Sequence, residues 1–375
     1  MTTTGTDSGR IRLGTRGSRL ALTQSGQVAE ALRAAGGGGA AAAAGKASEG
    51  SGGLGIDLVT VRTDGDGDRT PLRQLGGVGV FAARLRHALL DGEVDLVVHS
   101  FKDLPTHPVE GLEVVCVPPR EDPSDALCAR DGLTLATLPD GARVGTGSPR
   151  RAAQLLAARP DLEVVDLRGN VPTRLARVRG LEAVGVGTDE PVAPARADAA
   201  GDLDAVVLAL SGLRRLGLEH CASEVLDLET MLPAPAQGAL AVEARAGEDS
   251  VELARAVAVL DDEPTRLAVT AERALMARLG AGCAAPVGAW AYLRESSQAP
   301  RVLVLRAVVT SLDGGQEVGC ELSTELPEAS GGPGAPGNTA AVRAAEALGA
   351  RAAEVLLEDG AAQIVDLHAS KPRRD

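Results

Sequence analysis

DLVVHSFKDLP, residues 95–105, is an apolar run that ends in two opposite charges. The apolar residues 96–98 are typical of a strand that is buried on both faces of a sheet. Because Pro105 prevents the strand from continuing, Lys102 and Asp103 are expected at its carboxyl end. Ligands of open α/β sheets bind outside such ends, so Asp103 is a candidate acid or base, with Lys102 beside it. The alternative is a surface turn with a solvated ion pair.

The composition limits the class of protein. A chain of 375 residues is too long for one ordinary core, so two or three domains are expected. Hydrophobic residues make up 44% of the chain and aromatic residues only 1%, so Ala, Val and Leu must form the cores, which suits helices packed on parallel strands. The formal net charge of −13 disfavours nucleic acid and membranes as partners, because both require a basic face.

No metal site is predicted. The five cysteines contain no C-x-x-C pair, which leaves no zinc framework. Residues 64–75 begin like a calcium loop, but Arg69 and Leu75 occupy its sixth and twelfth positions. An odd number of cysteines indicates free thiols in a reducing compartment. Because residues 1–10 lack the features of a secretion signal and no apolar stretch approaches the roughly 20 residues of a membrane span, we expect a cytoplasmic protein.

The chain before the opening stretch predicts one α/β lobe, since strands alternate with helices. We expect strands at 11–13 and 56–62, and helices at 19–34 and 80–90. The turn GTRGS at residues 14–18 leads from a strand into a helix, where backbone N–H groups, Arg16 and Ser18 could hold a carboxylate or phosphate. Alternatively, Ser18 only caps the helix.

A second lobe is predicted by another series of strands, at 126–129, 143–145, 163–167 and 203–210. Ser148 and Pro149 are a strong helix start. Arg150 and Arg151 in the first turn oppose the helix dipole, an arrangement that is favourable if an anion binds there. The next turn between strand and helix repeats the pattern with two more arginines, Arg168 and Arg174, around Asn170. We expect one arginine rim along the sheet, although each arginine alone could be a solvated charge.

Composition breaks at 118–123 and 232–238 indicate that the chain enters and leaves the second lobe there, which makes a hinged cleft. The predicted fold is α/β, with two doubly wound lobes and a smaller α+β C-terminal domain. The last domain is expected to contain helices at 264–279 and 339–358 and strands near 287–293, 302–310 and 316–323, with a turn at 313–315. The domain boundaries are 1–118 with 239–258 returning to it, 124–232, and 263–375. Two insertions rich in Ala and Gly, 36–55 and 180–201, have no predicted function.

Cys283 lies in a loop of small residues, GAGCAAPVG at 280–288, where nothing bulky shields its sulfur. Such a thiol could be a nucleophile or an attachment point. The alternative is a small buried residue, because no histidine base lies nearby in the sequence.

Seven segments together resemble porphobilinogen deaminase, also called hydroxymethylbilane synthase. They occur in the order typical of that family and cover nearly the whole chain outside the insertions. The segments are LGTRGSRLAL (13–22), DLVVHSFKDLP (95–105), REDPSDAL (120–127), VGTGSPRRAAQL (144–155), LRGNVPTRL (167–175), LPAPAQGAL (232–240) and GAGCAAPVG (280–288).

The resemblance implies a fold similar to periplasmic binding proteins and an enzyme of tetrapyrrole biosynthesis. It implies that Cys283 carries a dipyrromethane cofactor through a thioether, assembled by the apoprotein from two substrate units. Asp103 assists loss of ammonia from porphobilinogen and stabilises the resulting cation, and Lys102 positions it. Four porphobilinogen units are added in turn, and hydrolysis frees hydroxymethylbilane. A monomer is expected.

The resemblance also implies how the acetate and propionate groups of the pyrroles are bound, since guanidinium groups suit carboxylates. For the cofactor it implies Arg150, Arg151, Arg168, Thr146, Ser148, Asn170 and Gln237. For the substrate it implies Arg16, Ser18, Arg168 and Arg174. Two residues depart from the family pattern: Val78 stands where lysine is frequent, and Gly147 where serine is frequent.

Two other classes of function compete with this interpretation. Two lobes with two crossovers also suit a carboxylate-binding protein or an effector domain without turnover, but simple binding does not explain a third domain that presents Cys283. A thiol-dependent hydrolase lacks a convincing Cys-His arrangement. Ammonia release from porphobilinogen separates the first alternative from a deaminase.

Overall fold

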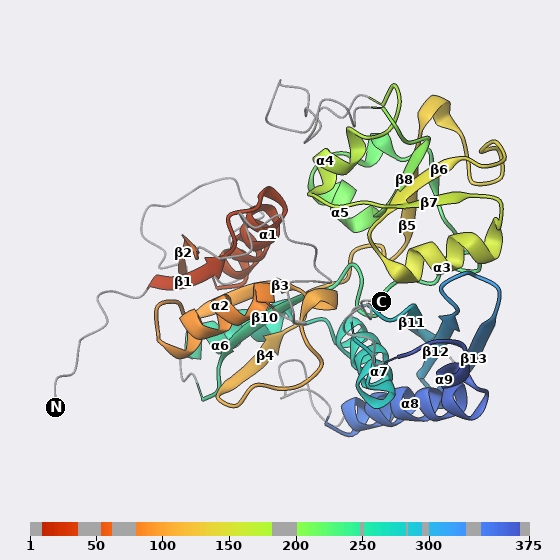
Figure 1. Ribbon diagram of the computed structural model, residues 1–375. Helices are drawn as coiled ribbons and strands as arrows, with labels where there is room; N and C mark the ends of the chain where they lie inside the picture. Colours follow the sequence, from red (N-terminus) through yellow and green to blue (C-terminus); the bar gives the residue numbers. More distant parts are fainter. Residues whose placement is uncertain are drawn as a thin grey trace.

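The computed structural model describes residues 10–36, 54–61, 80–181, 201–247, 251–282, 284–294, 300–327 and 339–367. Within these ranges the strands form three sheets, two of five strands and one of three. Figure 1 shows the five-stranded sheets in two separate lobes and the three-stranded sheet in a third unit. The predicted fold class, α/β with a smaller C-terminal unit, is confirmed.

The first lobe is built on a sheet in the order β2-β1-β3-β10-β4. β1 pairs in parallel with β2 and β3, whereas β10 is antiparallel to β3 and β4. The strands are β1 (Arg10–Thr15), β2 (Gly55–Thr60), β3 (Leu96–Ser100), β4 (Leu112–Cys116) and β10 (Leu240–Arg245). Because β10 follows the second lobe in sequence, the chain returns to this sheet after completing the other one.

Helices cover both faces of the central strand β3. Leu96 and Val98 pack into a cluster with residues of α1 and α6, whereas Val97 packs against α2 on the opposite face. The helices are α1 (Arg19–Gly36), α2 (Val80–Leu90) and α6 (Val251–Leu260). Burial of β3 on both faces, predicted from its apolar run, is confirmed. The residues that follow β3 therefore lie at one edge of a sheet that is covered on both faces.

The second lobe repeats this design, with the sheet order β7-β6-β8-β5-β9. β6 pairs in parallel with β7 and β8, and β5 is antiparallel to β8 and β9. The strands are β5 (Asp125–Ala129), β6 (Arg143–Thr146), β7 (Glu163–Asp166), β8 (Ala205–Ala209) and β9 (Glu224–Val225). The helices are α3 (Pro149–Ala158), α4 (Val171–Leu175) and α5 (Leu210–Arg215). In each lobe the antiparallel strand beside the centre, β5 or β10, directly follows a crossing between the lobes.

The two crossing segments, 117–124 and 232–239, contact each other. The Glu121 N–H donates to the carbonyl of Gly238 (3.4 Å). Gly238 has φ 88°, and a Cβ at this position would lie 2.2 Å from the Glu121 carbonyl oxygen. Glycine alone permits both the backbone conformation and the close approach. The lobes are therefore joined by a closely apposed pair of segments.

The C-terminal unit is an antiparallel sheet with helices on one face. Its strands are β11 (Val287–Arg294), β12 (Val302–Thr310) and β13 (Glu317–Glu325). Its helices are α7 (Glu263–Leu279), α8 (Thr339–Glu358) and α9 (Ala361–Ile364). Alternate residues of the strands form one apolar core with α7 and α8. In Figure 1, α7 stands between this sheet and the first lobe.

The only tryptophan and the only tyrosine of the chain lie together on β11. The rings of Trp290 and Tyr292 are stacked with centroids 4.4 Å apart. The alternating residues Ala289 and Ala291 belong to the core beneath the helices. The stacked pair therefore occupies the face of the sheet that points away from α7 and α8.

Long periodic elements were predicted best. The predicted helix at 339–358 coincides with α8, and the one at 264–279 starts one residue after α7 does. The hairpin turn predicted at 313–315 joins β12 to β13. β4 and α6 had no predicted counterpart. Most of both insertions (37–53 and 182–200), the whole calcium-like stretch 64–75, and Val78 lie outside the described residues.

Candidate active site

The loop after β3 carries the two charges on which the site was predicted. Phe101–Asp103 form one turn of 3₁₀ helix, closed by a hydrogen bond from the Leu104 N–H to the Phe101 carbonyl (3.2 Å). Phe101 and Leu104 are buried in the first lobe and anchor the turn. Asp103 is exposed, whereas Lys102 is half-buried. Two neighbouring residues of opposite charge therefore have different surroundings.

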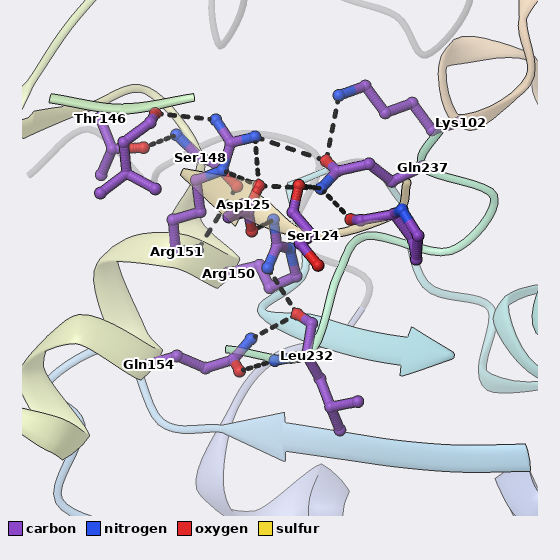
Figure 2. A network of polar contacts seen from close by, with 12 residues as sticks. Lys102, Ser124, Asp125, Thr146, Ser148, Arg150, Arg151, Gln154, Leu232 and Gln237 are labelled. Carbon is purple, nitrogen blue, oxygen red and sulfur yellow. Dashed lines mark hydrogen bonds and ion pairs between the residues drawn. The ribbon is translucent and has the colours of Figure 1, made fainter. Parts of the chain in front are cut away.

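Lys102 points from the first lobe toward the crossing. Its Nζ donates to Oε1 of Gln237 (3.2 Å), as Figure 2 shows. Burial lowers the pKa of Lys102 to about 8; the Asp103 carboxylate opposes this effect, and the Arg151 guanidinium adds to it. At pH 7 most Lys102 side chains remain charged, because the pH is still below this pKa.

Gln237, in the second crossing, connects the lysine to the second lobe. The residue is completely buried. Its Nε2 donates to Oδ1 of Asp125 (2.8 Å) and to the Pro123 carbonyl (2.7 Å). Its Oε1 faces Lys102 on one side and Nη2 of Arg151 (3.4 Å) on the other. In Figure 2 this amide lies between the lysine and the arginines of α3. It thereby links both lobes in one polar network.

Asp125, the first residue of β5, is the centre of that network. Its Oδ2 accepts from Nη2 of Arg150 (2.7 Å), and its Oδ1 accepts from Nη2 of Arg151 (2.7 Å). Burial alone would raise the pKa of Asp125, but the charges of both arginines outweigh burial and hold this pKa well below its usual range. One buried carboxylate is thus shared by two guanidinium groups.

This burial differs from the open arginine rim that was expected. Arg150 and Arg151 are 3% and 6% exposed, and each also donates to a backbone carbonyl, Arg150 to that of Leu232 and Arg151 to that of Val207. Sequence reasoning missed their partner, Asp125. A signal was present, because an aspartate that opens an apolar strand requires a buried cation.

Thr146 and Ser148 shape the start of α3. Ser148 caps the helix, as predicted: its Oγ accepts from the Arg151 N–H (3.5 Å). The Thr146 Oγ1 accepts from the Ser148 N–H (3.2 Å). Between them, a Cβ on Gly147 would lie 2.4 Å from the Leu167 carbonyl oxygen. This backbone leaves no room for the serine that is frequent there, so the glycine is a packing requirement here.

The second arginine pair flanks the turn into α4. Nε of Arg168 lies 3.7 Å from Oδ2 of Asp166, and Nε of Arg174 donates to the Gly169 carbonyl (2.7 Å). Burial lowers the pKa of Arg174 to about 10; Arg151 and Arg168 add to this, and Asp103 opposes it. The negative charge of Asp103, on the first lobe, therefore acts on Arg174 of the second lobe.

The remaining predicted residues of the lobes have local contacts. Asn170 is the cap of α4, and its Oδ1 accepts from the Thr173 N–H (2.9 Å). The Ser18 Oγ accepts from the Ala21 N–H (3.4 Å), which is a capping contact at the start of α1. Arg16 follows β1 and is half-buried. Ser18 thus has the helix-capping contact that was considered for it, and this contact leaves ligand binding untested.

Cys283 lies outside the described residues. Helix α7 ends at Leu279, and its C-cap Gly280 has φ 63°. Among the described neighbours of Cys283 in the sequence, the Ala285 N–H donates to the Gly282 carbonyl (3.0 Å). The end of α7 therefore leads directly to the predicted attachment point.

The described ranges contain neither a metal-binding cluster nor a helix that could span a membrane. No group of three or more His, Cys, Asp or Glu side chains there could hold a metal ion. Among the helices of these same ranges, none has the length and apolar character needed to cross a membrane.

Comparison with known proteins gives family matches over most of the chain. Residues 11–253 match the family model "Porphobilinogen deaminase, dipyromethane cofactor binding domain", and residues 266–358 match "Porphobilinogen deaminase, C-terminal domain". The chain belongs to the porphobilinogen deaminase family. The first model is named for the dipyromethane cofactor, in agreement with the cofactor that was predicted.

Curated porphobilinogen deaminases from several bacteria match at nearly full length. The one from Cutibacterium acnes is 52% identical over 97% of this chain and 99% of its own. Those from Micrococcus luteus and Thermobifida fusca are 49% and 47% identical, over 94% of this chain in both cases and over 93% and 95% of their own. These matches do not favour the interpretation as a binding protein without turnover.

Proposed function

We propose that this chain is a porphobilinogen deaminase, that is, a hydroxymethylbilane synthase of tetrapyrrole biosynthesis. It condenses four porphobilinogen units with loss of ammonia onto a dipyrromethane bound to Cys283, and hydrolysis then releases hydroxymethylbilane. The family matches support the reaction. The site-level support is the network that runs from Lys102 through Gln237 to Asp125, because it aligns the lysine beside Asp103 with the arginines of the opposite lobe.

The residues present fit a cofactor that carries several carboxylates. Nε of Arg150 is buried and has no hydrogen-bond partner among the described residues, so one donor remains for an acceptor. Arg168 and Arg174 add two guanidinium groups at the same end of the second sheet, and Lys102 adds a cation from the first lobe. We infer that Arg150, Arg151 and Arg168, with Thr146, Ser148, Asn170 and Gln237, hold the cofactor. When bound, the cofactor would supply the terminal pyrrole that accepts the first porphobilinogen unit.

Asp103 is the proposed catalytic carboxylate. Loss of ammonia breaks a C–N bond of porphobilinogen and leaves a cationic ring, which an adjacent carboxylate stabilises. The carbon–carbon bond then forms, and the proton displaced from the acceptor carbon requires a base. Asp103 suits both tasks, because its side chain is exposed and its carboxylate lies near the positive charges of Lys102 and Arg174.

The residues proposed to bind carboxylates differ in exposure. Arg150 and Arg151 are buried and paired with Asp125, which makes them a fixed source of positive potential. Arg16, Ser18, Arg168 and Arg174 are more accessible or lie on turns, and we assign the substrate carboxylates to them. Lys102 contributes a third type of contact as a half-buried point charge.

We further infer three domains that work as a cytoplasmic monomer without nucleic acid. The domain boundaries are 1–118 with 239–258, then 124–232, then 263–375. They are supported by the three separate sheets and by the return of β10 to the first one. A reducing compartment is supported by Cys116, Cys128, Cys221 and Cys320, all of which are free thiols.

The test is the intact mass of the purified, denatured protein, measured together with ammonia release from porphobilinogen. We expect a mass excess equal to one dipyrromethane, its loss in Cys283→Ser, and ammonia release by the wild type but not by Cys283→Ser. The matched control is Cys320→Ser, which removes a half-buried thiol of β13 and should keep both the excess mass and the activity. A wild type that forms no adduct and releases no ammonia after incubation with porphobilinogen would contradict the proposal.

A further inference from the structure

Arg273 of α7 holds the backbone of the loop that carries Lys102 and Asp103. Its Nη1 donates to the carbonyls of Leu104 (2.7 Å) and Phe101 (3.3 Å), and its Nη2 donates to that of Pro105 (2.7 Å). Its guanidinium carbon also lies 4.5 Å from the centroid of the Phe101 ring. One side chain from the C-terminal unit therefore binds three carbonyls within five residues of the first lobe.

The bound loop has little regular structure of its own. It is a single 3₁₀ turn, a conformation whose hydrogen bonds have poor geometry. Asp103 is exposed, so its carboxylate position depends on the path of this backbone. A planar guanidinium with several N–H donors fixes the orientation of the loop as well as its distance from α7.

The same helix also contacts the first crossing and the C-terminal sheet. Glu272, the residue before Arg273, accepts from Nη1 of Arg120 (2.7 Å) in the first crossing and from the Ala291 N–H (2.8 Å) in β11. The C-cap of the helix, Gly280, is three residues before Cys283 in the sequence. α7 is therefore the one element of the described chain that touches a crossing, the catalytic loop and the approach to the attachment cysteine.

We propose that Arg273 is a positioning residue for the deaminase reaction. It fixes the 101–105 loop to α7, and so holds the backbone of Asp103 in place relative to that helix. The inference rests on the proposed function. Since a displacement of about 1 Å at a reacting group costs roughly 10²-fold in rate, loss of this anchor is expected to reduce turnover more than substrate binding.

Arg266 provides a matched control on the same helix. It lies seven residues earlier, about two turns, and is also half-buried. Its Nη2 donates to the Val115 carbonyl (3.3 Å), and its Nη1 lies 3.5 Å from the Val114 carbonyl, both in β4 of the first lobe. Arg266 also pairs with Asp261. Arg266→Gln therefore removes a contact between α7 and the first lobe together with an ion pair, away from the catalytic loop.

The experiment compares Arg273→Gln, Arg273→Lys and Arg266→Gln in kcat, KM, intact mass and hydrogen exchange of the peptide 100–106. For Arg273→Gln we expect kcat to fall about 10- to 100-fold with KM changed less than about threefold, because the carboxylate-binding arginines are unaltered. Exchange at the Leu104 amide should accelerate, and the adduct mass should be retained. Arg273→Lys keeps one charged donor and should lie between wild type and Arg273→Gln.

Several outcomes would overturn the inference. Unchanged kcat in Arg273→Gln would mean that Arg273 is only a contact between domains. Equal losses of kcat in Arg273→Gln and Arg266→Gln would mean the same. Loss of the adduct would place its role in cofactor assembly. If the wild type released no ammonia, the proposed function would fail, but exchange of 100–106 would still show whether Arg273 holds the loop.

Discussion

At the scale of single residues, the site depends on neighbours with unequal exposure. Lys102 and Asp103 are adjacent in sequence, yet the lysine is half-buried against Gln237 and the carboxylate is exposed. The lysine keeps its charge at neutral pH, because the pH is below its pKa of about 8. An amide at position 103 preserves shape and hydrogen bonding but removes the negative charge and the base.

Asp103→Asn should therefore fold normally and lose nearly all turnover, by about 10²-fold or more in kcat. Ammonia release from porphobilinogen measures the rate, and the thermal unfolding midpoint measures the fold. Asp140→Asn serves as the control, because the Asp140 side chain is fully exposed at 103% of its reference area. Near-normal turnover in Asp103→Asn would contradict the catalytic assignment.

At the scale of elements, α3 combines an ordinary helix start with an unfavourable charge pattern. Ser148 and Pro149 begin the helix, but two arginines in the first turn oppose its dipole. Asp125 compensates for this by bringing a carboxylate from β5 under the helix start. The arrangement is stable only while that carboxylate is ionised.

Asp125→Asn should lower the free energy of unfolding at pH 7 by about 3–5 kcal/mol, because two buried guanidinium groups lose their counter-charge. The folded pKa of Asp125 is lowered, so the wild-type advantage is present above the unfolded pKa of about 3.9 and decreases as pH falls below that value. Urea unfolding at pH 7 and at lower pH measures the difference.

The control for this change is Asp57→Asn, which removes an exposed partner of Arg10 on the first lobe. It should leave unfolding at pH 7 nearly unchanged, because exposed ion pairs contribute little. A gap between wild type and Asp125→Asn that stays constant down to pH 3 would show that ionisation of Asp125 is not responsible.

Elements with strong local signals could be predicted from the sequence, and contacts between distant segments could not. The run at 96–98 indicated a buried strand because both faces were apolar, and Ser148 with Pro149 indicated a helix start. Asp125 and its arginines are 25 and 26 residues apart, and Arg273 is more than 160 residues from the loop it binds. No local pattern reports such pairings, because they arise only when separate elements pack.

At the scale of the whole molecule, the relation between the lobes is governed by the paired crossings. Gly238 allows them to approach so closely that a side chain at that position would overlap the Glu121 carbonyl. A substitution there combines strain from positive φ with a steric clash between the two crossing segments. Substitution of another glycine with positive φ, but without a close neighbour, separates the strain from the clash.

Gly238→Ala should lower the free energy of unfolding by roughly 2–4 kcal/mol, from the strained conformation and the clash together. Gly92→Ala provides the control, because Gly92 also has positive φ, 70°, but a Cβ there meets nothing within 4 Å. It should cost about 1 kcal/mol from strain alone. Urea unfolding compares the two, and equal losses would mean that the crossing tolerates the added methyl group.

The stacked rings on β11 determine what intrinsic fluorescence can report. Every photon emitted by tryptophan comes from Trp290, and the only tyrosine is its neighbour Tyr292, so the optical signal belongs to the C-terminal unit. The emission intensity and wavelength will change when the surroundings of that sheet change. They will change little when a rearrangement is confined to the two lobes. The molecule thus contains a natural single-site probe on the unit that leads to Cys283, and a lobe would become visible only after a tryptophan was introduced there.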